Sequence, residues 1–159
     1  MKTKRIFSLL TTGGLLAVLA ITTNMVASAQ AATPSLVGTW NTTTPQSEGN
    51  PRPTFQSMLT FFADGNMVET NTSNPATNTP AHGIWSRSGK DYQLTFESFT
   101  FDDQGKHTGK VRAYLTIKMD SPNHFTGTYT ADLIDLTGKV TKNVVYGSSD
   151  STRLLAEQP

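Results

Sequence analysis

The chain has no cysteine, few charged residues and no convincing helical pattern. Without cysteine there is no disulfide, no thiolate ligand for zinc and no thiol nucleophile. Charged residues make up 16% of the chain, well below the roughly 25% of an average soluble protein. No stretch repeats apolar residues with a period of 3.6, so no helix is predicted. The length of 159 residues favours a single domain.

Uncharged polar residues take the place of the missing charges. The chain holds 26 threonines, and threonine is β-branched and favours strands. From residue 32 onward, short β-rich runs are separated by Gly, Pro, Asn and Asp. The predicted strands are 36–43, 55–62, 66–71, 82–87, 92–101, 110–119, 124–133 and 144–155, the last of them interrupted around Gly147.

Residues 1–29 have the order of a secretory signal peptide. Three basic residues among the first five precede the apolar run 6–21, and small residues follow, so we expect cleavage after Ala29 or Ala31. A membrane anchor is the alternative, and the small residues favour cleavage. We therefore expect a secreted protein, extracellular or periplasmic, with a folded domain over 32–159 and no stable membrane span after cleavage. Export without any cysteine favours a bacterial source.

The charge of the mature chain excludes one class of partner. Cleavage removes three of the 13 basic residues and none of the 12 acidic ones, which leaves a net charge of −2. The remaining basic residues are scattered singly along the chain. A nucleic-acid binder needs a basic surface, so we expect no nucleic-acid partner.

Long and short connections between the predicted strands alternate. In an antiparallel meander consecutive connections lie at opposite ends, so all long connections are expected at one open end. Eight strands arranged in this way can close without an exposed edge. We predict an all-β fold, a single eight-stranded antiparallel up-and-down barrel. The tight turns are 63–65, 88–91 and 120–123, and the long connections are 44–54, 72–81, 102–109 and 134–142.

An early Gly38-Thr39-Trp40 and a late Arg153 carry a resemblance to a known family. The chain resembles the lipocalins and the wider calycin group, in which such a Trp and Arg meet at the closed end of the barrel. The resemblance implies that Gly38, Trp40 and Arg153 close the barrel, with the guanidinium within about 6 Å of the indole centre. The mature sequence also resembles small exported bacterial proteins of no established activity, through the stretches 81–85, 99–102 and 125–129.

Apolar residues of one parity are expected to line the barrel. A β-bulge near residues 97–98 would bring Phe99 to the inner face together with Phe96. An interior of this size either packs solid or holds one small apolar ligand. The candidate ligand-binding residues are Phe55, Leu59, Phe96, Phe99, Leu115 and Tyr129.

No motif carries chemistry by itself. His82 and His107 are expected at the open end, where a nearby aspartate could complete a zinc site, and His124 at the closed end. No spacing typical of metal ligands and no G-x-S-x-G motif occurs, so we predict no metal and no cofactor. Should the barrel be an enzyme, His82, Arg112 and Tyr114 are the catalytic candidates.

The leading hypothesis is that the protein binds a small hydrophobic molecule that enters through the open end. Leu115→Trp is expected to block this binding. Two alternatives stay open: an enzyme of the cyclase or isomerase type, and an exported interaction or inhibitor module that presents the loops 44–54 and 72–81. A cavity above about 300 Å³ would support a ligand. A buried, partnered His or Arg in it would support an enzyme, and a filled barrel the interaction module.

Overall fold

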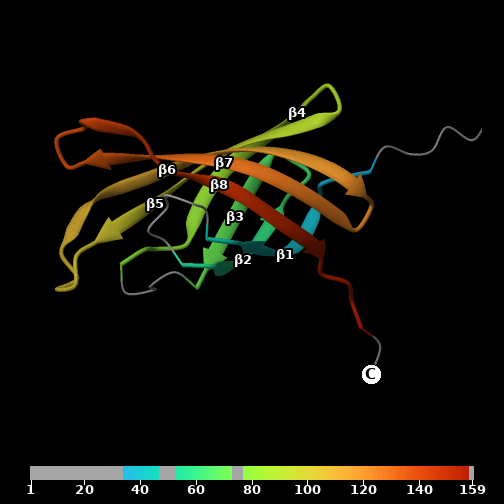
Figure 1. Ribbon diagram of the computed structural model, residues 1–159, viewed down its shortest axis with the longest axis horizontal. Coiled ribbons are helices and arrows are strands. Elements are labelled where there is room, and N and C mark those ends of the chain that lie inside the picture. Colours follow the sequence, from blue (N-terminus) through green and yellow to red (C-terminus); the bar gives the residue numbers. More distant parts are fainter. Residues whose placement is uncertain (1–33, 47–52, 73–76, 158–159) are drawn as a thin grey trace, which may run out of the picture. The chain divides into compact units, whose positions relative to one another are not determined.

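The computed structural model describes residues 34–46, 53–72 and 77–157, and these form one closed antiparallel barrel (Figure 1). Each strand pairs with the next in sequence, which confirms the predicted all-β up-and-down barrel. The predicted signal peptide 1–29 and its cleavage positions after Ala29 or Ala31 lie outside the described residues. The strands are β1 (Gly38–Thr44), β2 (Phe55–Phe61), β3 (Asn66–Asn71), β4 (Ala81–Ser88), β5 (Asp91–Phe101), β6 (His107–Ser121), β7 (His124–Asp135) and β8 (Val140–Arg153).

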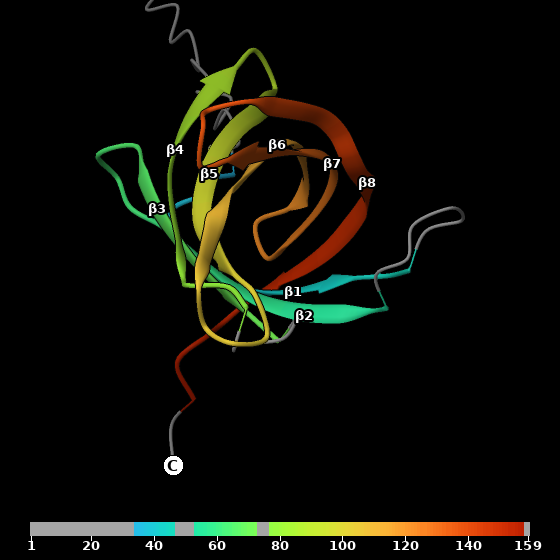
Figure 2. The ribbon, with the colours of Figure 1, turned by 90° about the vertical axis from the view of Figure 1, so that its left-hand side faces the viewer.

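The barrel closes where its first and last strands meet. β1 pairs with β8 in the register Trp40↔Arg153 and Thr42↔Ser151, so every strand has two neighbours (Figure 2). Closure removes the exposed edges that an open sheet of eight strands would present. Within the described part of the chain, no helix is long and apolar enough to cross a membrane.

Two of the four connections predicted as long are tight turns. Residues 102–106 and 135–139 share the pattern Asp-x-x-Gly-Lys and form the same hairpin turn. In each, the Asp carboxylate accepts hydrogen bonds from backbone N–H groups two and four residues later, and the Gly has a φ of +75° or +85°. Glycine adopts this left-handed conformation without strain. The expectation of long loops over 102–109 and 134–142 was therefore wrong, because β6 starts at His107 and β8 at Val140.

Two irregularities also differ from the sequence prediction. The pairing of β5 with β6 is continuous from Asp91 to Thr100, so there is no bulge near residues 97–98. The register shifts only between Thr100 and Phe101. In β8 the interruption expected around Gly147 is absent, since Gly147 pairs with Tyr129. The irregularity lies nearer the start of β8, where Asn143 has a φ of 53°.

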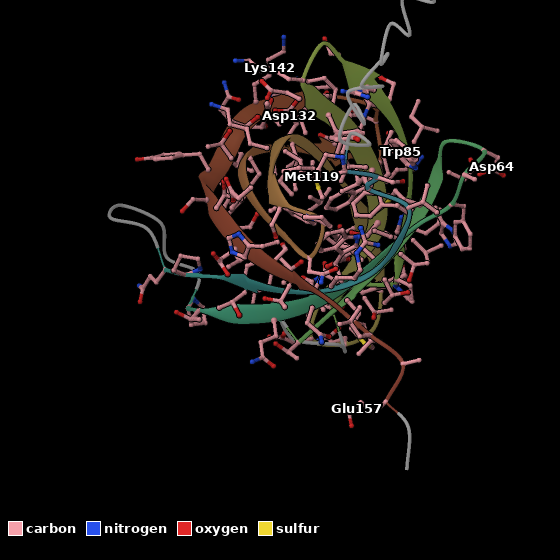
Figure 3. All side chains as sticks on the ribbon, turned by 90° about the vertical axis from the view of Figure 1, so that its right-hand side faces the viewer. Asp64, Trp85, Met119, Asp132, Lys142 and Glu157 are labelled. Carbon is pink, nitrogen blue, oxygen red and sulfur yellow. The ribbon has the colours of Figure 1, made fainter. Side chains whose placement is uncertain are left out.

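The core fills the closed end of the barrel, where the turns between β2 and β3, β4 and β5, and β6 and β7 lie. Trp40, Phe61 and Phe125 are almost fully buried, and Phe125 packs on both others, with ring centroids 4.7 Å apart for Trp40–Phe125 and 6.4 Å for Phe61–Phe125. Figure 3 views this end, with Met119 inside the ring of strands and Asp64 at the tip of the β2–β3 turn. The packed layer leaves open space only toward the opposite end.

Candidate functional site

Arg153 and Trp40 meet at the closed end, as the resemblance implies. The guanidinium carbon of Arg153 lies 4.2 Å from the centre of the Trp40 ring system, inside the expected 6 Å. Gly38 leaves room for this group, because a Cβ at Gly38 would come within 2.5 Å of Nη1 of Arg153. Burial, which lowers the pKa of Arg153, also removes water from the guanidinium and strengthens its attraction to the indole.

The segment just before β1 crosses beneath this pair. Arg153 donates to the carbonyl oxygens of Ser35 (2.5 Å) and Val37 (2.6 Å), and the indole N–H of Trp40 donates to that of Leu36 (2.9 Å). Leu36 is fully buried. These bonds hold residues 35–37 across the end of the barrel, so a ligand can enter only from the other end.

A cavity lies between the packed layer and the open end. Its volume is about 70 Å³, within about 680 Å³ of empty space that includes solvent at the mouth. The smaller figure is the volume of the cavity itself, and it does not reach the value of about 300 Å³ set above as support for a ligand. Only a molecule much smaller than a drug would fit. Thr44, Phe55 and Asn78 belong to the lining, and they lie where β1 ends, where β2 begins and in the connection after β3. The cavity therefore extends to the open end of the barrel.

One wall of the cavity is apolar and comes from β5, β6 and β7. Cross-strand register places Phe96 beside Ala113 and Ala113 beside Ala131, and in the adjacent row Leu115 beside Tyr129. Gly83 on β4 makes space for this wall, because any side chain there would collide with the Cβ of Phe96. On these strands the apolar residues that were expected to line the barrel do face its interior.

The opposite wall comes from β8, β1, β2 and β3 and is largely polar, although Phe55 and Leu59 of β2 also line the cavity. Ser151, Thr42, Ser57 and Asn71 follow one another in register across these four strands. The hydroxyls of Thr42 and Ser151 form a buried hydrogen bond of 2.8 Å. The sequence prediction named apolar residues on only four of the strands, and it did not include these polar groups.

Glu69 adds a carboxylate to the polar wall. It lies on β3 directly between Leu59 and Ala81 in the neighbouring strands, and only 4% of it is exposed. The side-chain amide of Asn71 donates a hydrogen bond of 2.9 Å to its Oε1 atom. A carboxylate buried to this degree needs polar partners, because water no longer solvates it.

Ser149 on β8 is the second unusual polar group of the lining. Ser149 is 5% exposed, and its hydroxyl oxygen has no hydrogen-bond partner among the residues that the structure describes. Buried hydroxyls are normally hydrogen-bonded, so this one is an exception that adjoins open space. That space is the cavity, which Ser149 lines.

Five of the six predicted ligand-binding residues line this cavity, namely Phe55, Leu59, Phe96, Leu115 and Tyr129. Phe99 does not, because the absent bulge leaves it on the outer face, where it is 47% exposed. Its ring packs on His107 instead, with the centroids 5.4 Å apart.

The three catalytic candidates lie on the outside of the barrel. His82, Glu97, Arg112 and Asp132 follow one another in register across β4, β5, β6 and β7, on the face opposite the cavity. Arg112 donates from Nε to Oε1 of Glu97 at 2.7 Å, and this bond holds the pKa of Glu97 below its usual value. His82 is exposed.

Tyr114, the third candidate, lies two residues beyond Arg112 on β6, in the adjacent row of the same face. Its hydroxyl donates to Oδ2 of Asp132 at 3.4 Å, and the backbone N–H of Asn143 donates to Oδ1 at 2.9 Å. The carboxylate thereby fixes the irregular start of β8. The described lining of the cavity contains neither His nor Arg.

The histidines do not form a metal site. His107 bonds through Nε2 to the carbonyl of Gly109 at 2.9 Å. His124, at the closed end as expected, lies between Asp120 and Asp150, with its two ring nitrogens 3.0 Å from their carboxylates. Among residues 34–46, 53–72 and 77–157, no three His, Cys, Asp or Glu side chains are grouped to hold a metal.

Sequence reasoning missed the polar wall, although its signal was present. Thr42 and Thr44 have the same parity as Trp40, and Glu69 and Asn71 have the same parity as Met67. Strict alternation would have placed all of them inside. Comparison of the chain with family models, with curated proteins and with solved structures finds no match, so the site must be interpreted from its own geometry.

Proposed function

We propose that the protein binds one small, partly apolar molecule inside the barrel, entering through the open end. The observation that carries the proposal is a cavity that is blocked below by a packed layer and reaches the opposite end of the strands. A preformed site of this kind binds with little reorganisation, which favours affinity.

The size of the cavity sets the size of the ligand. One water-sized group needs about 10–15 Å³ of cavity volume. A cavity of 70 Å³ therefore holds roughly five to seven groups of that size. The ligand is therefore much smaller than a lipid or a typical fluorescent dye. The arrangement of Gly38, Trp40 and Arg153 supports a relationship to the lipocalin-like barrels.

Export belongs to the same proposal. The basic, apolar and small-residue order of positions 1–32 supports secretion, and binding of a small external molecule fits a secreted barrel. The expected signature is a mature N-terminus at Gln30 or Ala32, determined by N-terminal sequencing of exported material. A product that retains residues 1–29 in the membrane would contradict this part.

The binding test uses three probes of similar shape: cyclopentane, cyclopentanol and cyclopentylamine. Each is titrated into protein labelled at its methyl groups, and NMR shifts are followed at Ala113, Leu115 and Ala131, which line the apolar wall. We expect saturable shifts at these methyls for at least one probe. Leu115→Trp should abolish them while the circular dichroism spectrum stays that of a β protein.

One control variant and one failure criterion complete the test. Met58→Trp adds the same bulk on the outer face, where Met58 is 53% exposed, and should leave binding unchanged. If none of the three probes shifts the cavity methyls of the wild-type protein, the proposed function is wrong.

A further inference from the structure

The inner end of the cavity carries a buried hydroxyl group, that of Ser149, which nothing in the described part of the chain satisfies. Ser149 is 5% exposed, and its Oγ atom has no hydrogen-bond partner there. It stands on β8 two residues from Ser151, which is fully buried and pairs with Phe125 of the packed layer. Ser149 therefore lies next to the packed layer and lines the cavity that begins above it.

The residues across from Ser149 on the neighbouring strands bring no side-chain oxygen or nitrogen to its hydroxyl. Ser149 pairs with Gly127 on β7, and Gly127 pairs with Ile117 on β6. A Cβ at Gly127 would come within 2.7 Å of the Ser149 Oγ atom, so the glycine leaves this oxygen its place. Glu69 and Asn71 line the cavity too, but both already have partners within the protein. A buried hydroxyl without a partner costs free energy, which a ligand atom that bonds to it recovers.

We propose that the ligand is a small aldehyde or ketone whose carbonyl oxygen accepts a hydrogen bond from the Ser149 hydroxyl. Its hydrocarbon part packs against the apolar wall formed by β5, β6 and β7. This inference rests on the proposed function, because it names the class of molecule that the same cavity takes.

Counting donors and acceptors distinguishes a carbonyl compound from the alternatives. A hydrocarbon leaves the Ser149 hydroxyl unbonded. An alcohol can bond to it, but two hydroxyls use only one of their two hydrogens in that bond, so the second O–H needs another acceptor. A carbonyl oxygen carries no hydrogen, and one bond from Ser149 satisfies both groups.

The charge of the lining disfavours an acid as the ligand. The described lining of the cavity contains no Lys, Arg or His. A carboxylate that entered would lose its water without gaining a positive partner, which is strongly unfavourable. A carbonyl group is an uncharged acceptor and avoids this cost.

The first test compares cyclopentanone with the cyclopentanol used above. The two molecules share one ring and carry a single oxygen each, so their affinities are directly comparable. We expect cyclopentanone to bind more tightly by roughly tenfold, because the alcohol keeps one O–H to satisfy elsewhere. Equal or tighter binding of the alcohol overturns the inference.

The second test removes the hydroxyl. Ser149→Ala should weaken binding of cyclopentanone by roughly tenfold and should not weaken binding of cyclopentane, which makes no bond to Ser149. Ser148→Ala is the matched control, because it is the same substitution one residue away, on the exposed outer face of β8. It should change neither dissociation constant. A ketone affinity that Ser149→Ala leaves unchanged overturns the inference.

The infrared carbonyl stretch of bound cyclopentanone provides a readout on the wild-type protein. Hydrogen bonding lowers the frequency of this stretch, which lies above the amide band of the protein. We expect a lower frequency in the wild-type complex than in cyclohexane, and a return to the cyclohexane value in Ser149→Ala. An unshifted stretch in the wild-type complex overturns the inference. A shift that persists in Ser149→Ala also overturns it, because water or another residue is then the donor.

Failure of this inference is distinguishable from failure of the proposed function. Binding of cyclopentane or cyclopentanol that Leu115→Trp blocks, without the effects expected of the ketone, leaves the proposed function standing and removes the carbonyl assignment. Absence of binding by every probe removes both.

Discussion

Replacement of Arg153 by lysine tests the closure of the barrel. In the native protein Arg153 stacks on Trp40 and donates three hydrogen bonds, to the carbonyl oxygens of Ser35, Val37 and Pro122. A lysine ammonium can replace only part of this set, because it lacks the planar fork that reaches several acceptors at once. Loss of two hydrogen bonds at about 1 kcal/mol each, and of about 0.5–1 kcal/mol of stacking, gives about 2–3 kcal/mol.

The loss is measured by urea and thermal unfolding, followed by circular dichroism. For a domain of this size 1 kcal/mol shifts Tm by roughly 4 °C, so Arg153→Lys should lower Tm by about 10 °C. Arg87→Lys is the control, since Arg87 lies 5.9 Å from the Tyr92 ring on an exposed hairpin and should change stability by less than about 0.5 kcal/mol. If Arg153→Lys is as mild as this control, the closure argument is wrong.

Two further predictions concern single residues. The hydrogen bond to Asp150 raises the pKa of His124 above 6.5, so the stability that this bond contributes is complete below about pH 6.5 and is lost as the pH rises through the folded-state pKa. NMR titration should give a raised pKa for His124, and Asp150→Asn should lower it. A pKa that this variant leaves unchanged would refute the contact. Gly109→Ala should destabilise the protein by at least about 2 kcal/mol in urea unfolding, because the backbone of Gly109 has a φ of +145° and a Cβ there would collide with the carbonyl oxygen of Ile134. Gly89 has open space around it, so Gly89→Ala should cost only about 1 kcal/mol. Equal losses for the two variants would contradict the collision.

Most strands could be predicted because apolar and polar residues alternate along them, and because glycine, proline, asparagine and aspartate stand in the turns between them. β3 begins and ends where the sequence predicted, since Asp64-Gly65 fixes its start and polar residues follow its end. β6 and β8 start earlier than the sequence predicts, because tight turns and not long loops precede them. The repeated Asp-x-x-Gly-Lys pattern at 102–106 and 135–139 would have identified both as tight turns.

The site was predicted only in part, because residue hydrophobicity was given more weight than strand parity. Phe99 is apolar yet lies outside, and Glu69 is charged yet lies inside. Apolar residues are often exposed, so hydrophobicity alone places a residue poorly, whereas the side-chain period of two in a strand holds until a bulge interrupts it. The volume of the cavity could not be predicted at all, because it depends on how Trp40, Phe61 and Phe125 fill the closed end in three dimensions.

The bonds from Arg153 to Ser35 and Val37 also bear on folding kinetics. They join residues 118 and 116 positions apart in the chain, and β1 can pair with β8 only once the last strand is available. Non-local pairings of this kind make folding slow, because the entropy of loop closure precedes the contacts that offset it. Until Arg153 docks, β1 and β8 each present an unpaired edge that can pair with another chain. Aggregation during refolding should therefore be governed by this final closure step, and variants that weaken it should aggregate even where the folded barrel remains stable.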